Sequence, residues 1–245
     1  MSDAFIKNPF LPEKEVKVCI VSCDAEDVIK SLENRGISVL RVKKSEKLPE
    51  PISSHADLQV LPLGDNLIAI NEEQEELIYE LLHLGFEIIP VTGFSSEYPY
   101  DCVLNHLIIK NHLFGNKKAI ASSIISLNSF EIINVRQGYT KCSSILFDTD
   151  TVITDDISIY RTIKKYIRQA FIVEQNEVIL QGYDHGFIGG TCGKLNKSLI
   201  CFAGKIPDTV FGNSLKILLH SLAIDYIQVG EEKLRDIGGI IPILI

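Results

Sequence analysis

The stretch GFEIIPV occupies residues 85–91, and a near copy, SFEIINV, occupies residues 129–135. Both read as buried strands because apolar residues dominate them. Similar segments stand at 36–42 (GISVLRV) and 223–229 (AIDYIQV), with a weaker one at 176–182 (NEVILQG). Together they recur with a period of about 45 residues, which indicates a repeated supersecondary unit.

Each of these strands follows a segment whose apolar residues are spaced by three and four, as an amphipathic helix requires. The predicted helices lie at residues 24–35, 72–84, 117–129, 157–169 and 209–223. Before the last four helices, two short strand-like runs flank turn residues that hairpins favour, at 64–66, 110–111, 148–150 and 196–197. The predicted unit is therefore strand–strand–helix–strand.

The first unit has only one strand before its helix, VKVCIVS at 16–22, and a lone strand candidate ends the chain at 237–245. Pairing these two segments would complete the first unit and close the sheet edges. The sequence thus predicts an α/β fold, a five-bladed pseudo-fivefold propeller formed as a single domain over residues 1–245. Its units are expected at 237–245 plus 16–42, 57–91, 103–135, 142–182 and 189–229.

Composition narrows the function classes. The formal net charge of −8 disfavours nucleic acid as a partner and mildly favours a cationic ligand. No apolar run approaches 18 residues, so no membrane helix is expected. The N-terminus lacks a signal-peptide pattern, and six scattered cysteines read as free thiols, so a cytoplasmic location is expected. The expected partner is a small molecule, and the oligomeric state stays open.

Five such units closed into a ring resemble the pentein, or guanidino-modifying-enzyme, fold. The segments LRDIGGIIPI (234–243), YDHGFIGGTCGK (183–194) and HADLQVLPL (55–63) also look like an uncharacterised clostridial-type family with that fold. The resemblance implies a cysteine nucleophile, a histidine acid/base and carboxylates that hold a guanidinium, as in arginine deiminases, dimethylarginine hydrolase and amidinotransferases. Other penteins are non-catalytic and bind a partner.

The last strand departs from the pentein hydrolases, which keep their nucleophilic cysteine there. In this chain the segment reads DIGGIIPILI (236–245) and contains no Cys, Ser or Thr. Two hypotheses follow. The protein is an enzyme of guanidino type with an unconventional nucleophile, or it is a non-catalytic pentein that binds a protein partner or a small cationic ligand.

A column of polar residues recurs when the four complete units are aligned on their turns: Gln59, Asn105, Ser144 and Thr191. Strands buried on both faces are normally continuous apolar runs, so these side chains are expected to face a central channel and to contact a ligand. The alternative is that they hydrogen-bond one another and fill the axis.

His55 and Asp57 are spaced by two, which on a strand places both side chains on one face. They could form an acid/base pair. The resemblance does not carry this role over, because the pentein His-x-Asp lies in a later unit, and a surface or capping pair is the alternative. Cys142 shares the column of Asp57 and is the cysteine expected to face the axis, with a small core side chain as its alternative.

Asp184 and His185 precede the glycine-rich segment GFIGGTCG (186–193), which leaves room for a ligand or another strand. Cys192 could act as a nucleophile only if the fold brought a base such as His185 to it. Strand alternation turns Cys192 away from the face of Thr191, so the structural interpretation is favoured.

Asp101 and Asp236 stand at equivalent strand starts, and with Asp57 and Asp184 they could surround one mouth of the channel. Clustered carboxylates suit a guanidinium or ammonium group. Ordinary strand-end and turn carboxylates are the alternative. Cys19-x3-Cys23 and Cys102-x3-His106 do not make a matched zinc pattern, so neither a metal nor a cofactor is expected.

Overall fold

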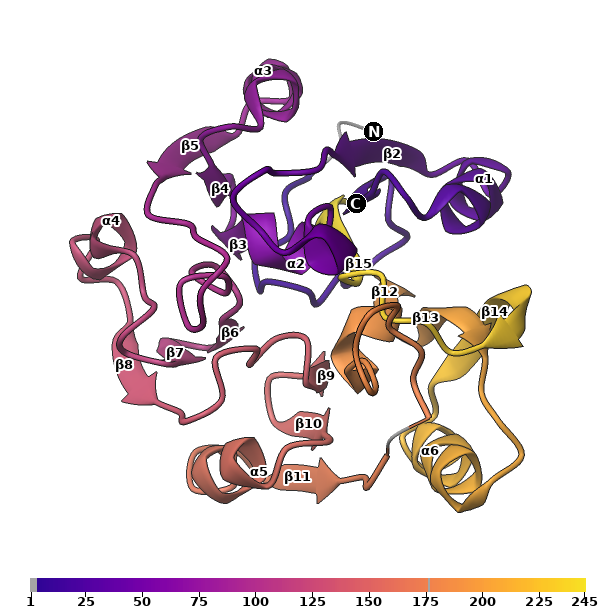
Figure 1. Cartoon of the computed structure of the whole chain (residues 1–245). Helices are drawn as coiled ribbons and strands as arrows, with labels where there is room; N and C mark the ends of the chain where they lie inside the picture. Colours follow the sequence, from indigo (N-terminus) through magenta and orange to yellow (C-terminus); the bar gives the residue numbers. More distant parts are fainter. Residues whose placement is uncertain (1–3, 176) are drawn as a thin grey trace.

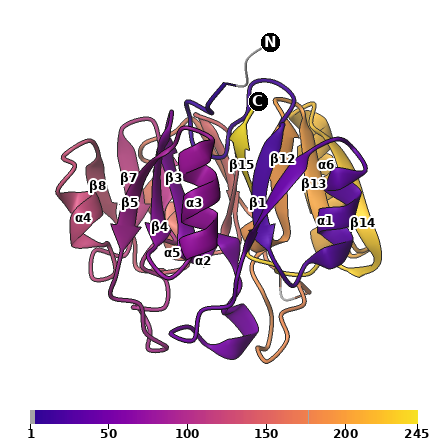
Figure 2. The same cartoon turned by 90° about the horizontal axis from the view of Figure 1, so that it is seen from above.

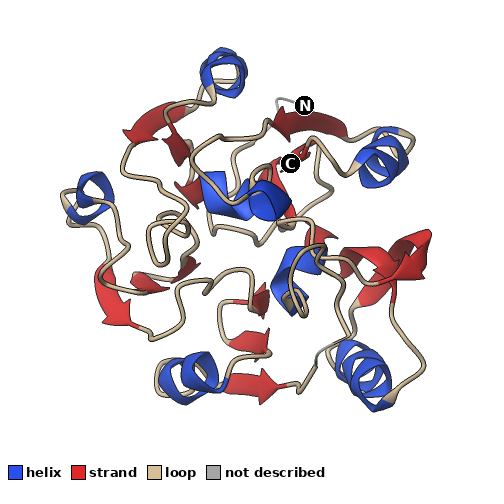
Figure 3. Ribbon diagram, viewed as in Figure 1, coloured by secondary structure: helices blue, strands red, loops and turns tan. Residues whose placement is uncertain are grey.

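The computed structural model describes residues 4–175 and 177–245 as an α/β propeller with five blades around a pseudo-fivefold axis (Figure 1). Each blade is a three-stranded sheet. Its inner strand runs antiparallel to the middle strand, and the middle strand runs parallel to the outer one. Parallel neighbours need a crossover connection, and a helix on the periphery supplies it in every blade (Figure 3).

The elements follow the predicted order in each blade, from the inner strand outward. The first blade contains β15 (Ile240–Leu244), β1 (Val18–Ser22), α1 (Glu26–Glu33) and β2 (Ser38–Val42). The second contains β3 (Val60–Gly64), β4 (Leu67–Asn71), α3 (Glu75–His83) and β5 (Glu87–Val91). The third contains β6 (Leu107–Ile109), β7 (His112–Gly115), α4 (Ser122–Ile125) and β8 (Glu131–Asn134).

The last two blades have the same order. The fourth contains β9 (Ser144–Asp148), β10 (Thr151–Thr154), α5 (Ile157–Ile163) and β11 (Gln169–Ile172). The fifth contains β12 (Cys192–Asn196), β13 (Leu199–Lys205), α6 (Val210–Ser221) and β14 (Asp225–Lys233). Three short helical segments lie between blades: η1 (Glu50–Ile52), α2 (Ala56–Gln59) and η2 (Ile188–Thr191).

The first blade confirms the predicted closure, because the C-terminal strand β15 pairs antiparallel with β1. Leu244 lies opposite Val18, and Ile240 lies opposite Val21. Every residue of both strands is buried, as expected for the inner and middle strands of a blade, which are covered on both faces by neighbouring blades. The two described ends of the chain meet at one end of the propeller, and the segment around α2 lies at the opposite end (Figure 2).

The helices are amphipathic, as the spacing of their apolar residues predicts. In α3, Leu77 and Leu81 are buried on one face, while Glu75 and Glu76 in the first turn and His83 in the last complement the helix dipole. The outer strands are partly exposed along most of their length, whereas the strands β1 and β15 are buried throughout. None of the helices in the described part of the chain is long and apolar enough to cross a membrane.

The outer strand of the fourth blade was predicted wrongly. It is β11, not the segment 176–182, of which residue 176 lies outside the described residues. The helix α5 ends at Ile163, earlier than its apolar spacing suggested, so residues 169–172 come into parallel register with β10. Ile179, inside the predicted strand, makes only an isolated bridge to Arg235.

The inner strands also begin later than predicted. They were expected from residues 57, 103, 142 and 189, but they begin at Val60, Leu107, Ser144 and Cys192. The residues before them form the α2 turn, loops and the η2 turn, because their polar groups bond across the axis rather than along a strand ladder. His55 and Asp57 therefore lie at the start of a helical turn and not on a strand.

Candidate functional site

A closed set of hydrogen bonds surrounds the axis, with one segment from each blade, and we call it the axial ring. The links are Asp57 N–H to Gly238 O (3.0 Å), Asn105 Nδ2 to Asp57 O (3.1 Å), Cys142 N–H to Asn105 Oδ1 (3.0 Å), Gly190 N–H to Cys142 O (3.0 Å) and Gly239 N–H to Gly190 O (2.8 Å). Three of the five links join main-chain groups of neighbouring blades, and the other two use the side-chain amide of Asn105. The Gly239 link returns to the first blade and closes the ring. The ring therefore fixes the residues that carry the site.

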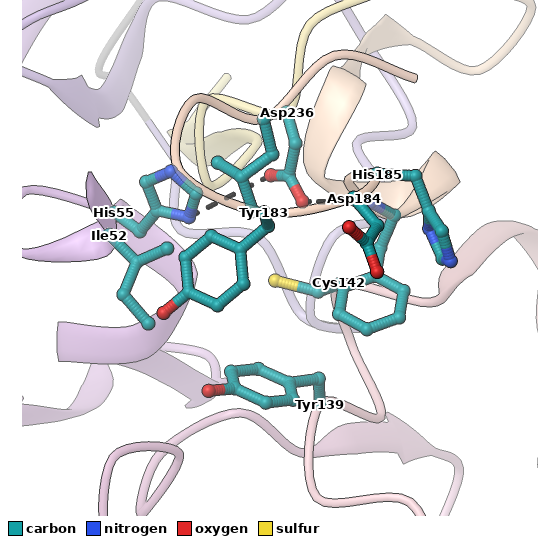
Figure 4. Close-up of a pocket in the computed structure, with 10 residues that line it drawn as sticks. Ile52, His55, Tyr139, Cys142, Tyr183, Asp184, His185 and Asp236 are labelled. Atoms are coloured by element: carbon teal, nitrogen blue, oxygen red, sulfur yellow. Dashed lines mark hydrogen bonds and ion pairs between the residues drawn. The ribbon is translucent and has the colours of Figure 1, made fainter. Parts of the chain in front are cut away.

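A cavity of about 260 Å³ lies on one side of the axial ring, and we call it the axial cavity (Figure 4). Its lining residues are Ile52, His55, Tyr139, Cys142, Leu180, Tyr183, Asp184, His185, Phe187 and Asp236. The Tyr139 and Phe187 rings stack at 5.5 Å between centroids. Aromatic walls over a few convergent polar groups are typical of small-molecule sites.

The thiol of Cys142 points into the axial cavity, towards the space between His55, Tyr183 and Tyr139 (Figure 4). Its Sγ donates to Asp57 Oδ2 at 2.8 Å and accepts from Asn105 Nδ2 at 3.2 Å. Burial raises the pKa of the Cys142 thiol well above its usual value, and the Asp57 and Asp236 carboxylates raise it further. The surroundings of Cys142 therefore favour the protonated thiol over the thiolate.

His55 and Asp236 lie beside the thiol, with His55 Nδ1 3.7 Å from Asp236 Oδ1. The buried Asp236 accepts from Phe187 N–H at 2.9 Å and from Gly238 N–H at 3.1 Å. Burial raises the pKa of Asp236, and His55 opposes that shift. His55, Asp57 and Cys142 each have one nitrogen, oxygen or sulfur atom that could bind a metal ion, and these three atoms lie within 4.8 Å of one another. The structure thus brings together four of the predicted site residues.

One wall of the axial cavity is the loop that contains Tyr183, Asp184, His185 and Phe187, and the first three are exposed on its rim. A second carboxylate fastens the end of this loop, because Asp155 Oδ2 accepts from Ile188 N–H at 2.8 Å. Gln175 Nε2 also donates to Asp155 Oδ2, at 2.8 Å. Burial raises the pKa of Asp155 to about 7. The loop therefore depends on two buried carboxylates, Asp155 and Asp236.

The glycines of the segment 186–193 allow close approach of backbone and side chains within the protein. A Cβ on Gly190 would lie 1.9 Å from Asp236 Oδ1, and one on Gly189 would lie 2.1 Å from Ser144 O. The sequence left open whether these glycines make room for a ligand or for another part of the chain. In the structure, atoms of the protein itself lie next to both glycines.

The predicted polar column does not line one channel. Asn105 contacts both Cys142 and Asp57, but Thr191 Oγ1 donates to Ile188 O at 2.7 Å and Gln59 Nε2 donates to Ser53 O at 2.6 Å. The reason is that the inner strands start after Gln59, Asn105 and Thr191, and only Ser144 lies within a strand, so the column has no common face. Gln59 and Thr191 donate to nearby main-chain carbonyls, so they neither line a common channel nor hydrogen-bond the other column residues.

Asp101 and Cys192 lie behind or beyond the axial cavity. Asp101 accepts a hydrogen bond from the Tyr139 hydroxyl, so it supports a wall residue rather than lining the mouth. Cys192 lines a separate cavity of about 20 Å³ with Ser144, Lys141 and Lys194, which we call the channel cavity. Burial raises the pKa of Cys192 to about 12. His185 stays on the rim, so it does not form a pair with Cys192.

The sequence reasoning missed Asp155 and the aromatic walls Tyr139, Tyr183 and Phe187. Two of these aromatics flank residues that the sequence did single out, Asp184 and His185. An aromatic residue beside a candidate charged residue was the signal that could have found them. Nothing in the local sequence of Asp155 distinguishes it from the neighbouring Asp156, which caps α5.

No curated protein matches the chain in sequence. Solved structures do match in fold. StrB1, an inosamine-phosphate amidinotransferase from Streptomyces griseus, has a TM-score of 0.62 at 10% identity, with 96% of each chain covered. SxtG, an amidinotransferase from Microseira wollei in the saxitoxin biosynthetic pathway, has a TM-score of 0.58 at 11% identity, with 91% of each chain covered.

A third structure, DDAH from Pseudomonas aeruginosa in complex with citrulline, has a TM-score of 0.55 at 8% identity and covers 88% of this chain and 92% of its own. At such identities the likeness shows the fold, which is the pentein, or guanidino-modifying-enzyme, fold. A family model described as a family of unknown function, DUF6873, matches residues 20–241. The chain therefore belongs to the DUF6873 family and has the pentein fold.

Proposed function

We propose that the axial cavity binds a small molecule with a guanidinium or amidinium group and that Cys142 attacks the central carbon of that group. The observation that carries the proposal is the position of two buried carboxylates, Asp57 and Asp236, beside a buried thiol under aromatic walls. Among the described residues that line this cavity, none is Lys or Arg, so a cationic ligand would meet negative charge.

The shape of the site supports a planar cation. A guanidinium stacks on aromatic faces and binds a carboxylate through two parallel hydrogen bonds. Tyr139 and Phe187 supply stacked faces, and Asp236 supplies a carboxylate whose oxygens are otherwise held by main-chain N–H groups and His55. The amidinotransferases and DDAH that share the fold act on molecules of this kind, as their names indicate.

The thiol would become a nucleophile only when the ligand is present. A bound cation offsets the two carboxylates and lowers the pKa of Cys142, so its proton passes to Asp57 at 2.8 Å and from Asp57 to His55. The sulfur then forms a bond to the amidinium carbon, and His55 protonates the amine as the C–N bond breaks. Water or a second amine would release the remaining group from sulfur. This nucleophile lies in the fourth blade, whereas the last strand has none.

A second candidate function is binding without chemistry, either of a small cation or of a protein partner. It is favoured by the burial of the Cys142 thiol, which raises its pKa and opposes formation of a thiolate, and by the absence of Cys, Ser and Thr from the segment 236–245. All six cysteines are free thiols, which supports a reducing, cytoplasmic location for either function.

Thermal unfolding with arginine, agmatine, dimethylarginine, citrulline, creatine and amino-acid controls, in the presence of EDTA, tests the proposal. A ligand at 100 times its Kd should stabilise the fold by about 2.7 kcal/mol. Asp236→Asn should abolish the shift, and Asp225→Asn, an exposed aspartate on β14, should keep it. Urea or ureido products, or a covalent adduct lost in Cys142→Ala, would identify an enzyme, whereas a shift without either would identify a binder. The absence of any shift and any turnover across the panel would overturn the proposal.

A further inference from the structure

The floor of the axial cavity brings together one imidazole, one carboxylate and one thiol. They belong to His55, Asp57 and Cys142, and one possible metal-ligand atom of each lies within 4.8 Å of the other two. All three residues are buried, with relative exposures of 5%, 1% and 2%. Cys142 is 85 positions from Asp57 in sequence, so only the closed propeller assembles the set.

The second observation is an unused acceptor in this cluster. Asp57 Oδ1 is buried and has no hydrogen-bond partner within residues 4–175 and 177–245, although Asp57 Oδ2 is bonded to Cys142. A buried carboxylate oxygen without a partner is costly. A cation among the three side chains would satisfy it.

The donor types select the cation. Sulfur, imidazole nitrogen and carboxylate oxygen together suit Zn²⁺, whereas Ca²⁺ and Mg²⁺ prefer oxygen ligands alone. Zinc ligands at about 2.0–2.3 Å from the metal are separated by roughly 3.5 Å, so side-chain shifts of about 1 Å would close the present spacing. We propose that His55, Asp57 and Cys142 bind Zn²⁺ as three protein ligands, with the fourth position facing the axial cavity.

The zinc-bound cluster accounts for its charges and for the proton of the Cys142 thiol. Binding converts the Cys142 thiol to a thiolate, and its proton is released to solvent. The ion also offsets the negative charge of Asp57 and of Asp236, whose Oδ1 lies 3.7 Å from His55 Nδ1. Zn²⁺ and a guanidinium would occupy the same floor and exclude each other. The metal site does not depend on the proposed function, because it needs no organic ligand.

Titration of metal-free protein with Co²⁺, followed by Zn²⁺, provides the test. Cobalt bound by a thiolate gives a sulfur-to-metal charge-transfer band, and a four-coordinate site gives intense visible bands. We expect both bands, their loss on adding one equivalent of Zn²⁺, and release of about one proton per metal. Competition with a chromophoric chelator gives the zinc Kd.

Variants locate the site. Cys142→Ser should remove the charge-transfer band, and His55→Gln and Asp57→Asn should each weaken zinc binding by about 100-fold or more. Cys23→Ser, at a partly exposed thiol, should leave the spectrum and the Kd unchanged. Should a cluster variant fail to fold, zinc protection of Cys142 from alkylation in the wild-type protein, read by peptide mass, reports the same contact.

The proposal is overturned if the wild-type protein gives no thiolate band, if Cys142→Ser retains it, or if Cys23→Ser removes it. Because the organic panel is measured in EDTA, a failed metal titration and a failed ligand panel are separate results. A positive result in both predicts that Zn²⁺ weakens binding of the organic ligand.

Discussion

The two sides of the axial ring differ in charge and in space. On one side lies the axial cavity of about 260 Å³, which Asp236 and the thiol of Cys142 line. Asp57 lies beneath it and accepts a hydrogen bond from that thiol. On the other side, the channel cavity holds about 20 Å³ and is lined by Lys141 and Lys194. Adjacent residues, Lys141 and Cys142, serve opposite sides of the ring.

On the lysine side, carbonyl groups of the protein itself accept hydrogen bonds from both ammonium groups. Lys141 Nζ donates to Gly189 O at 3.1 Å and lies 5.2 Å from the Phe10 ring centroid, and Lys194 Nζ donates to Phe147 O and Lys197 O. The carboxylate side leaves Asp57 Oδ1 without a partner among the described residues. The comparison teaches that repeats with one architecture support opposite chemistry, so the site residues and not the repeat determine function.

The largest expected effect is the loss of close packing where the two sides meet. A methyl group on Gly189 would lie 2.1 Å from Ser144 O and 2.5 Å from Lys141 O, both of them backbone atoms. Gly189→Ala should therefore destabilise the fold by more than about 4 kcal/mol, measured by urea unfolding. Gly93→Ala, at a φ of +89° with no atom within 4 Å, is the control and should cost about 1 kcal/mol. Equal losses would show that the ring is not tightly packed.

The carboxylate side should lose stability as pH rises through the acidic range. Burial raises the pKa of Asp155 from 3.8 to about 7, so between these values the folded protein holds a proton that the unfolded chain releases. The contribution is complete below about pH 4 and is lost by about pH 7, with a slope of at most about 1.4 kcal/mol per pH unit. Asp155→Asn should flatten the wild-type dependence in this window, and Asp225→Asn should not. An unchanged slope in Asp155→Asn would contradict the burial of this carboxyl.

The lysine side should show the opposite slope at higher pH. Burial lowers the pKa of Lys194 from 10.5 to about 8, so the unfolded chain binds the extra proton between these values. Stability should rise with pH from about 8 to 10, by a smaller total amount because this window is narrower. Lys194→Met should remove the rise, and Lys117→Met, at an exposed lysine in the third blade, serves as control. A rise that persists in Lys194→Met would assign it to other groups.

Most of the fold could be predicted because the same pattern of strands and helix recurs along the sequence about every 45 residues. Apolar spacing identified five helices, and strand-like runs identified the blades and the closure by the last strand. The fourth outer strand could not be found in this way. NEVILQG is more apolar in its middle than β11, but parallel register with β10 and the early end of α5 decide which segment pairs.

The site could be predicted only in part. Spacing singled out His55 and Asp57, the column shared with Asp57 singled out Cys142, and equivalent strand starts singled out Asp236, and these four residues do meet. The column of Gln59, Asn105, Ser144 and Thr191 failed because it required the residues before the inner strands to be extended, and α2 and η2 are helical turns there. The contact between Cys142 and Asp57 joins different blades, and the angle between blades has no signature in local spacing.

The pairing of the chain ends has a further consequence. Ala4 N–H donates to Ile245 O, and Ile245 N–H donates to Ala4 O, both at 2.9 Å. These two hydrogen bonds hold Ala4 beside Ile245, next to the strand pair that completes the first blade. A circular permutant with a linker between the ends and a new start at the exposed turn around Asp65 would make the first blade continuous and would leave the axial ring, and every group on its floor, in place.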